Sequence, residues 1–200
     1  MKVVGLAIVR TGSDLNEPVP LTVATELSSF GFFQRQSVKE MLMFLTKTFM
    51  KRTEPGQRQS VEHEGYVVHC YVRSDGLGGT VTTDGEYPAR VAFVMLGQLL
   101  DEFAQKQGDS WKTVTTPESV TFPPADEYLQ KYQNPAEADK ITKIQKDLDE
   151  TTQILHKTID SVLERGVKLD NLVEKSNDLS AQSKLFYKSA KKTNSCCVVS

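Results

Sequence analysis

The 200-residue sequence predicts an α+β domain followed by a long helical coiled-coil segment. Two observations carry this prediction. The first part mixes short apolar runs typical of strands with stretches of helical spacing, whereas residues 141–193 repeat apolar side chains about every 3.5 residues. Between the parts, Gln133-Asn134-Pro135 breaks the chain, because the residue before proline disfavours helix. We therefore expect a domain at 1–132, a linker at 133–139, a coiled-coil motif at 140–195 and a tail at 196–200.

The first part has the signals of a sheet flanked by helices. Val3 to Arg10 is a nearly continuous apolar run, which suits a central strand covered on both faces. Ser37 and Glu40 form a capping box before one amphipathic helix, and Pro88 opens a second. The full prediction comprises strands at 3–10, 21–27, 59–63, 66–73 and 79–83, and helices from 37, from 88 and over 126–132.

The second part holds one unbroken seam, in which positions are spaced alternately by three and four residues from Ile141 to Thr193. Such a seam is the core of a coiled coil, and it runs over more than about seven heptads. Gly166 and five Ser or Thr positions weaken the helix, so we expect the isolated segment to be unfolded until partner helices bind. The predicted apolar layers are Ile141, Ile144, Leu148, Leu155, Val162, Leu169, Leu172, Leu179, Phe186 and Ala190.

Arg165 occupies a seam position between Val162 and Leu169. A guanidinium stays charged in a core and needs acceptors for its five donors, so a homodimer that stacks arginine on arginine is disfavoured. The arginine instead calls for other helices that bring acceptors to this layer, where it would fix the register. The alternative is an arginine that extends out of an ordinary seam into water.

The stretch Val162-Leu163-Glu164-Arg165-Gly166-Val167-Lys168-Leu169-Asp170-Asn171-Leu172 resembles the R-SNARE motif of synaptobrevin-like proteins. The resemblance implies that Arg165 is the ionic layer of a parallel four-helix bundle. Its partners would be one glutamine from each of three Q-SNARE helices (Qa, Qb and Qc), and the general SNARE disassembly machinery would separate them. The implied function is vesicle docking and membrane fusion on ER–Golgi, Golgi, endosomal or vacuolar routes.

The first part resembles a longin domain. The resemblance rests on the order of its elements and on the runs Phe32-Phe33-Gln34-Arg35-Gln36-Ser37-Val38 and Asp84-Gly85-Glu86-Tyr87-Pro88-Ala89-Arg90. It implies a profilin-like, five-stranded sheet flanked by helices. It also implies that the domain inhibits the SNARE segment by folding back on it.

The tail Cys196-Cys197-Val198-Val199-Ser200 carries the covalent chemistry. Cys197 heads a C-a-a-X box whose terminal serine favours farnesylation, and Cys196 is placed for reversible palmitoylation. One prenyl chain anchors a protein only marginally, so a second lipid or basic charge is needed. The four lysines between 184 and 192 supply that charge. We expect no cofactor besides these lipids, and a protein divided between the cytosol and the cytoplasmic faces of Golgi, ER-derived, endosomal or vacuolar membranes.

Phe44 and its neighbours are the candidate for an apolar patch on the domain, with Met43 beside it and more aromatic surface just before the helix at Phe30, Phe32 and Phe33. Val38, Met41, Leu45 and Phe49 share a face that covers the sheet, whereas Phe44 points partly elsewhere. Phe44 either fills the core of the domain or forms an exposed patch that the SNARE segment and the prenyl group cover.

Other functional classes find little support in the sequence. The net charge of −2 gives no reason to expect nucleic acid binding. The three histidines have no cysteine or carboxylate at metal-ligand spacing, and Cys70 reads as a buried core thiol. The rival interpretations are a regulatory or tethering longin module and an acyl-transfer activity of the first domain. The intact seam disfavours the former, no residue constellation supports the latter, and we expect a protein that is not an enzyme.

Overall fold

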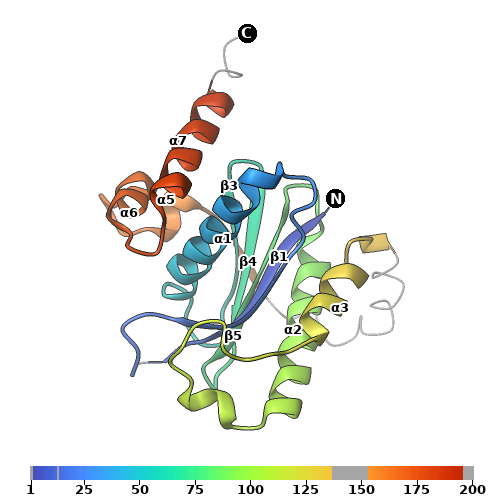
Figure 1. The fold of residues 1–200 in the computed structure, drawn as a ribbon. Coiled ribbons are helices and arrows are strands. Elements are labelled where there is room, and N and C mark those ends of the chain that lie inside the picture. The colour runs from blue at the N-terminus through green and yellow to red at the C-terminus, as the bar shows by residue number, and fades with distance from the viewer. Residues whose placement is uncertain (1, 13, 137–152, 196–200) are drawn as a thin grey trace.

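The computed structural model describes residues 2–12, 14–136 and 153–195, which form a mixed sheet with helices on both faces (Figure 1). The strands are β1 (Val3–Arg10), β2 (Val19–Thr25), β3 (Arg58–His63), β4 (Tyr66–Val72), β5 (Leu77–Asp84) and β6 (Ile154–Thr158). They lie in the order β2-β1-β5-β4-β3-β6. The first five strands pair antiparallel with their neighbours, whereas β6 runs parallel to β3. The five predicted strands of the domain are thereby confirmed, and a sixth comes from the second part of the chain.

The helices divide between the two faces of the sheet. They are α1 (Arg35–Met50), α2 (Ala89–Gln107), α3 (Pro124–Lys131), α5 (Ile159–Val162), α6 (Leu169–Lys175) and α7 (Ala181–Ser195), with short 3-10 helices η1 (Phe32–Gln34) and η2 (Ser110–Thr113). One face packs against α2 and the other against α1, as Figure 1 shows. Every residue of β1 is buried, as its apolar run predicted for a central strand covered on both faces.

The start of α1 differs from the prediction. The helix begins at Arg35, after the turn of η1, and its N-cap residue Gln34 makes no side-chain capping bond. Ser37 therefore lies inside the helix and is buried, so the predicted capping box is wrong. The guanidinium of Arg35 donates to the carbonyl oxygen of Phe30 at 3.2 Å and ties the preceding turn to the helix, but it supplies no acceptor for the first amides of α1.

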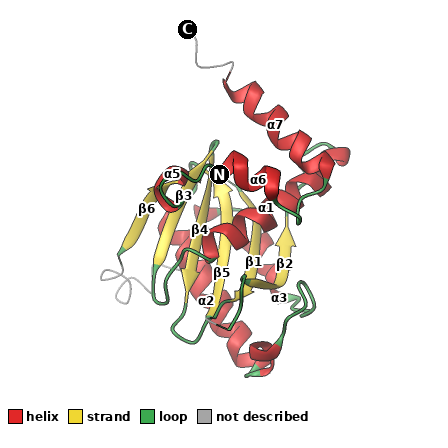
Figure 2. Cartoon of the chain, turned by 90° about the vertical axis from the view of Figure 1, so that its left-hand side faces the viewer, coloured by secondary structure: helices red, strands yellow, loops and turns green. Residues whose placement is uncertain are grey.

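The described part of the seam departs most from the sequence pattern, because it forms no continuous helix. It consists of strand β6 and three separate helices that wrap around α1 and the edge of the sheet (Figure 2). A turn at 164–167 divides α5 from α6, closed by a 2.9 Å bond from the amide of Val167 to the carbonyl of Glu164. Gly166 has a φ of +88°, which favours glycine and is incompatible with a right-handed helix. The seam buries its apolar side chains against its own domain here, and that contact replaces partner helices.

Candidate functional site

The contact between α1 and the seam segment is the feature that joins the two parts of the chain. Residues from both parts form a single apolar cluster on one side of the sheet. From the seam segment this cluster takes Leu163, Leu169, Val173, Leu179 and Tyr187, and from the domain it takes Met41, Phe44, Leu45, Phe49, Val61 and their neighbours. The two parts therefore share one hydrophobic core, and separating them would expose both sides of it.

Phe44 lies within this cluster and is only 7% exposed. It lines a surface hollow together with Leu172 and Ser176 of the seam segment, so its outer side faces α6 and the turn after it. Met41 and Leu45 of the same helix line a different cavity, which they share with Phe186 of α7. Phe44 thus belongs to a buried cluster to which both the domain and the seam segment contribute, and its role as a covered patch stays a prediction.

Three residues of this interface lie outside the predicted seam. Leu163, Val173 and Tyr187 are 5%, 0% and 6% exposed, although none of them is a predicted layer position. Val173 and Tyr187 share one heptad position with Ile159, which is partly buried against the same cluster. That third apolar stripe is a signal in the sequence that our interpretation missed. The closed arrangement therefore buries a second face of the segment in addition to the seam residues Leu169 and Leu179.

The predicted layer residues differ in burial and in secondary structure. Leu169 and Leu179 are buried in the interface, whereas Val162, Leu172 and Phe186 are half-buried. Leu155 lies in β6, in register with Gln59 of β3, so this layer residue belongs to a strand. The predicted layers Ile141, Ile144 and Leu148 lie outside the described residues, as do both tail cysteines, Cys196 and Cys197.

A carboxylate of the domain fastens the start of α7. Glu40 accepts hydrogen bonds from the amide of Ser180 at 2.9 Å and from the hydroxyl of Ser183 at 2.7 Å. Partial burial raises the pKa of Glu40, but these bonds and a third from Gln36 outweigh it and lower the pKa to about 2. The first turn of α7 thereby obtains an acceptor from the domain itself, which couples this helix to α1.

Further polar contacts surround this fastening. Lys47 of α1 pairs with Asp178 at 2.8 Å, just before α7 begins. Tyr187 stacks on His63 with ring centroids 6.3 Å apart and donates to Asp170 at 2.8 Å. These pairs are partly exposed and each contributes little, so the apolar cluster supplies most of the stabilisation.

An apolar cavity of about 340 Å³ lies where α7 passes the start of α1. Phe30, Met41 and Leu42 form its wall on the domain, and Phe186 and Ala190 form its wall on α7. Its volume falls near the lower end of the range of about 300–1,000 Å³ typical of small-molecule sites. It is a space lined by apolar side chains from both parts of the chain, directly before the cysteines of the tail.

Arg165 is exposed in the turn between α5 and α6. The residue that the seam predicts at the centre of a helical bundle therefore lies outside any helix in this arrangement. Its neighbour Gly166 allows both conformations, because glycine accepts the positive φ of the turn and still enters a helix at a cost of about 1 kcal/mol.

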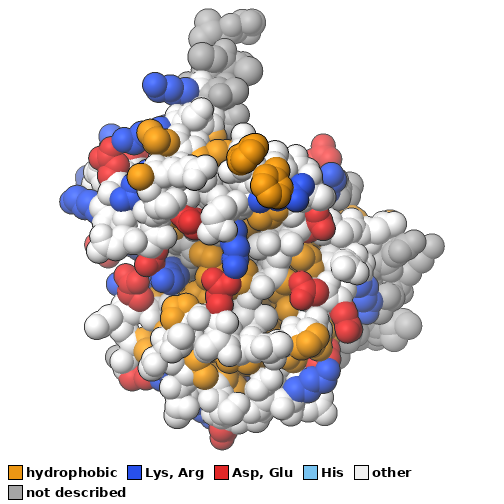
Figure 3. Space-filling view, viewed as in Figure 1, with side chains coloured by type: hydrophobic (Ala, Val, Ile, Leu, Met, Phe, Trp, Pro, Cys, Tyr) orange, Lys and Arg blue, Asp and Glu red, His pale blue; other side chains and the backbone are white. Residues whose placement is uncertain are grey.

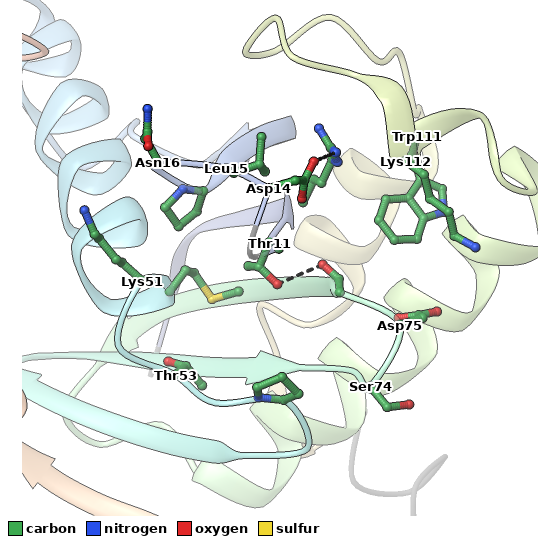
Figure 4. A pocket seen from close by; sticks show the side chains of 16 residues that line it. Thr11, Asp14, Leu15, Asn16, Lys51, Thr53, Ser74, Asp75, Trp111 and Lys112 are labelled. Atoms are coloured by element: carbon green, nitrogen blue, oxygen red, sulfur yellow. Dashed lines mark hydrogen bonds and ion pairs between the residues drawn. The ribbon is translucent and has the colours of Figure 1, made fainter.

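A second cavity, of about 640 Å³, lies at the opposite end of the sheet (Figure 4). Its walls mix apolar side chains such as Met50 and Trp111 with polar ones, and Lys51 and Lys112 lie on opposite sides. The carboxylate of Asp14 is paired with Arg10, and the hydroxyl of Thr11 donates to a backbone carbonyl at 2.9 Å. These groups are satisfied by one another, and the cavity contains none of the predicted site residues.

A serine–histidine pair also lies inside the domain. Ser60 Oγ and His69 Nδ1 are 2.8 Å apart, and His69 Nε2 lies 3.2 Å from the hydroxyl of Thr83. Both members of the pair are almost fully buried, and burial lowers the pKa of His69 to about 4, so the ring stays neutral. The pair satisfies polar groups between strands. Cys70 is fully buried, as predicted, and burial raises the pKa of its thiol.

Comparison with known proteins places both parts of the chain in named families. Residues 27–129 match a family described as the longin, regulated-SNARE-like domain, and residues 140–198 match synaptobrevin. The chain is 52% identical to the VAMP-like protein YKT61 of Arabidopsis thaliana. It is 50% identical to the synaptobrevin homolog ykt6 of Schizosaccharomyces pombe and 45% identical to YKT6 of Saccharomyces cerevisiae. Each match spans the whole of both chains. Within the described residues, none of the helices has the length and apolar character to cross a membrane.

Proposed function

Because the chain belongs to the family of Ykt6-type synaptobrevin homologues, the longin-domain R-SNAREs of vesicle transport, we propose that it rests in a closed state. In this state the longin domain covers the SNARE segment and keeps it from the partner helices. SNAREs act by assembling into a complex and belong to a non-enzymatic class. The observation that carries the proposal is the shared core, in which Val173 is fully buried against the surface that contains Phe44.

The closed state and a SNARE bundle exclude each other. A bundle needs the seam as one continuous helix, whereas β6 is extended and Gly166 has a positive φ. The whole segment from β6 to α7 would have to leave the longin domain, and β6 and the loops between the helices would have to become helical. Release of the segment is therefore the step at which assembly is controlled.

In the assembled bundle, Arg165 would form the charged layer. We propose that its guanidinium donates to one glutamine from each of the three helices Qa, Qb and Qc, and that the general disassembly machinery later separates them. A charge in the core is retained at the expense of stability, and its use is to fix the register of the four helices.

Membrane attachment would come from the tail. We propose a farnesyl group on Cys197 and a palmitoyl group on Cys196, since a single prenyl chain holds a protein only marginally. In the closed state the apolar cavity beside α7 would take the prenyl chain, which gains about 0.8 kcal/mol for each CH₂ removed from water. The protein would then exchange between the cytosol and the membranes of ER–Golgi, Golgi, endosomal or vacuolar routes.

The substitution Val173→Glu tests the closed state, because Val173 is neither a predicted bundle layer nor a residue of the longin domain. Burying a valine contributes about 1.5–3 kcal/mol, so its replacement by a charge shifts the closed-to-open ratio at least about tenfold. We expect faster binding to Q-SNARE helices, measured by stopped-flow fluorescence, and a larger membrane-bound fraction in cells. Phe44→Glu tests the same contact from the other side.

Asn171→Glu is the matched control, because Asn171 lies exposed on the same helix and the substitution adds the same charge. It should leave the binding rate unchanged. If Val173→Glu binds Q-SNARE helices at the rate of Asn171→Glu while its longin domain stays folded by circular dichroism, the closed state does not control assembly. If neither variant binds Q-SNARE helices, the R-SNARE activity itself is in doubt.

A further inference from the structure

Two phenylalanines just before α1 are exposed to solvent even in the closed arrangement. Phe32 and Phe33 are 76% and 84% exposed, and their rings meet edge to face with centroids 5.5 Å apart. At about 150–250 Å² for each ring, the pair presents roughly 300 Å² of apolar surface. An adjacent pair exposed to this degree is unlike the single exposed apolar residues that are ordinary on protein surfaces.

The backbone beneath the pair is held firmly. Both residues lie in η1, whose turn is closed by a 2.8 Å bond from the amide of Gln34 to the carbonyl of Gly31. Arg35 donates to the carbonyl oxygen of Phe30 at 3.2 Å and to that of Ser28 at 3.5 Å, so its side chain braces the loop on the other side. The backbone of the turn is therefore ordered before binding, so contact with a surface adds little backbone ordering entropy.

The pair lies at the end of the molecule where the chain leads to its tail. Phe30, two residues before the pair, lines the same cavity as Phe186 and Ala190 of α7. α7 continues past this cavity to Ser195, and the cysteines of the tail follow directly. Figure 1 shows the end of α7 and the start of α1 at the same end of the sheet.

The same end carries basic side chains. α7 contains Lys184, Lys188, Lys191 and Lys192 and no acidic residue. Lys188 and Lys191 pair with Glu174 and Asp170 of α6 in exposed contacts, which water and salt screen. Residues 169–195 still hold five lysines against three acidic side chains. Figure 3 shows hydrophobic side chains exposed over the start of α1 and lysines or arginines gathered along α7.

We propose that Phe32 and Phe33 form a membrane-contact site, which inserts into the interfacial region of an anionic bilayer while the lysines of α7 lie over its headgroups. Aromatic side chains beside lysines are the composition of surfaces that lie in the membrane interface. The inference rests partly on the proposed lipid anchor, since the site would hold the tail cysteines close to the bilayer. The phenylalanine pair lies on the longin domain, outside the SNARE seam and outside the lining of the cavity, whereas the lysines belong to α7.

Vesicle binding by the full chain with Cys196→Ser and Cys197→Ser tests the site without any lipid anchor. We expect binding to vesicles of phosphatidylcholine with about 30% phosphatidylserine, a loss at high salt, and at least about tenfold weaker binding after Phe32→Ser and Phe33→Ser. In a separate variant, Phe33→Trp should shift its emission to the blue on vesicles and be quenched by brominated acyl chains. Trp111, the single tryptophan of the chain, is 3% exposed and supplies a constant reference.

Leu185→Ser is the matched control, because Leu185 is 68% exposed on α7 and outside η1. It should change vesicle affinity less than about twofold. Equal losses in Leu185→Ser and in the double phenylalanine variant would assign the contact to α7 and overturn the proposal. Unchanged binding after loss of both phenylalanines would also overturn it. So would self-association that depends on the pair in sedimentation velocity without vesicle binding, because the occupant would then be a second copy of the chain. Lipidation of the natural tail is measured separately by mass spectrometry, so failure of the anchor and failure of the site are distinguishable.

Discussion

The substitution Gly166→Ala should open the closed state. Gly166 lies in the turn at 164–167 with a φ of +88°, a region that costs an L-residue about 1–2 kcal/mol. No atom lies within 4 Å of a Cβ built at this position, so the effect comes from the backbone alone. The open fraction of the SNARE segment should therefore rise roughly 5- to 30-fold.

The same substitution favours the assembled bundle. Alanine in a helix interior is about 1 kcal/mol more favourable than glycine, so the helical segment gains stability in the complex. The two effects act at different stages, because the first raises the rate at which the segment becomes available and the second slows dissociation of the bundle. A single methyl group thus distinguishes the closed conformation from the bundle.

Two measurements follow these effects. Hydrogen exchange of the backbone amides in β6 and α6 should show protection reduced by the factor given above, since these amides exchange through opening. Stopped-flow binding to soluble Q-SNARE helices should accelerate by a similar factor where opening limits the rate. Both assays use the full chain without its lipids, so the membrane does not contribute.

Gly97→Ala is the matched control. Gly97 lies inside α2, and a Cβ built there also meets nothing within 4 Å. This substitution should stabilise the longin domain by about 1 kcal/mol and leave opening unchanged. The reasoning fails if Gly166→Ala leaves the exchange of β6 and α6 unaltered, or if Gly97→Ala accelerates Q-SNARE binding equally.

Three further predictions concern the fastening of α7, the charged layer and the tail. The pKa of Glu40 lies near 2 in the closed state against an ordinary value of 4.5, so its contribution to closure is complete above pH 4.5 and is lost as the pH falls toward 2; Glu40→Gln should abolish this pH dependence of amide exchange at the start of α7, and an unchanged profile would contradict it. Arg165→Leu should permit bundle formation with looser register and partner choice, because apolar area replaces the charge; selection of the same Q-SNARE helices in competition assays, with normal disassembly, would show that the arginine fixes neither. Cys197→Ser should leave the protein in the cytosol and prevent palmitoylation of Cys196, because prenylation first brings the tail to the membrane; a palmitoylated Cys196 in that variant, seen by mass spectrometry, would reverse the order.

The sequence alone was sufficient to predict the architecture of the longin domain and to identify the second part of the chain as an R-SNARE segment. The apolar run of β1, the helical spacing of α1 and α2 and the turn residues between strands are local signals, and each was confirmed by the element at that place. The seam and Arg165 likewise identify the segment, because a repeat of about 3.5 residues with one charge is a property of the chain itself.

The tertiary structure decided what the segment does in the absence of partners. Leu155 fits a helical seam, yet it lies in β6, because the open edge of β3 offers hydrogen bonds that a free segment lacks. The burial of Val173 and Tyr187 depends on the apolar surface of the longin domain, which no periodicity in residues 141–193 describes. A repeating pattern specifies which side chains are apolar and favour burial. The surface that is available to them determines where they are buried. The exposure of Phe32 and Phe33 was decided in the same way, since the turn of η1 directs both rings away from the core.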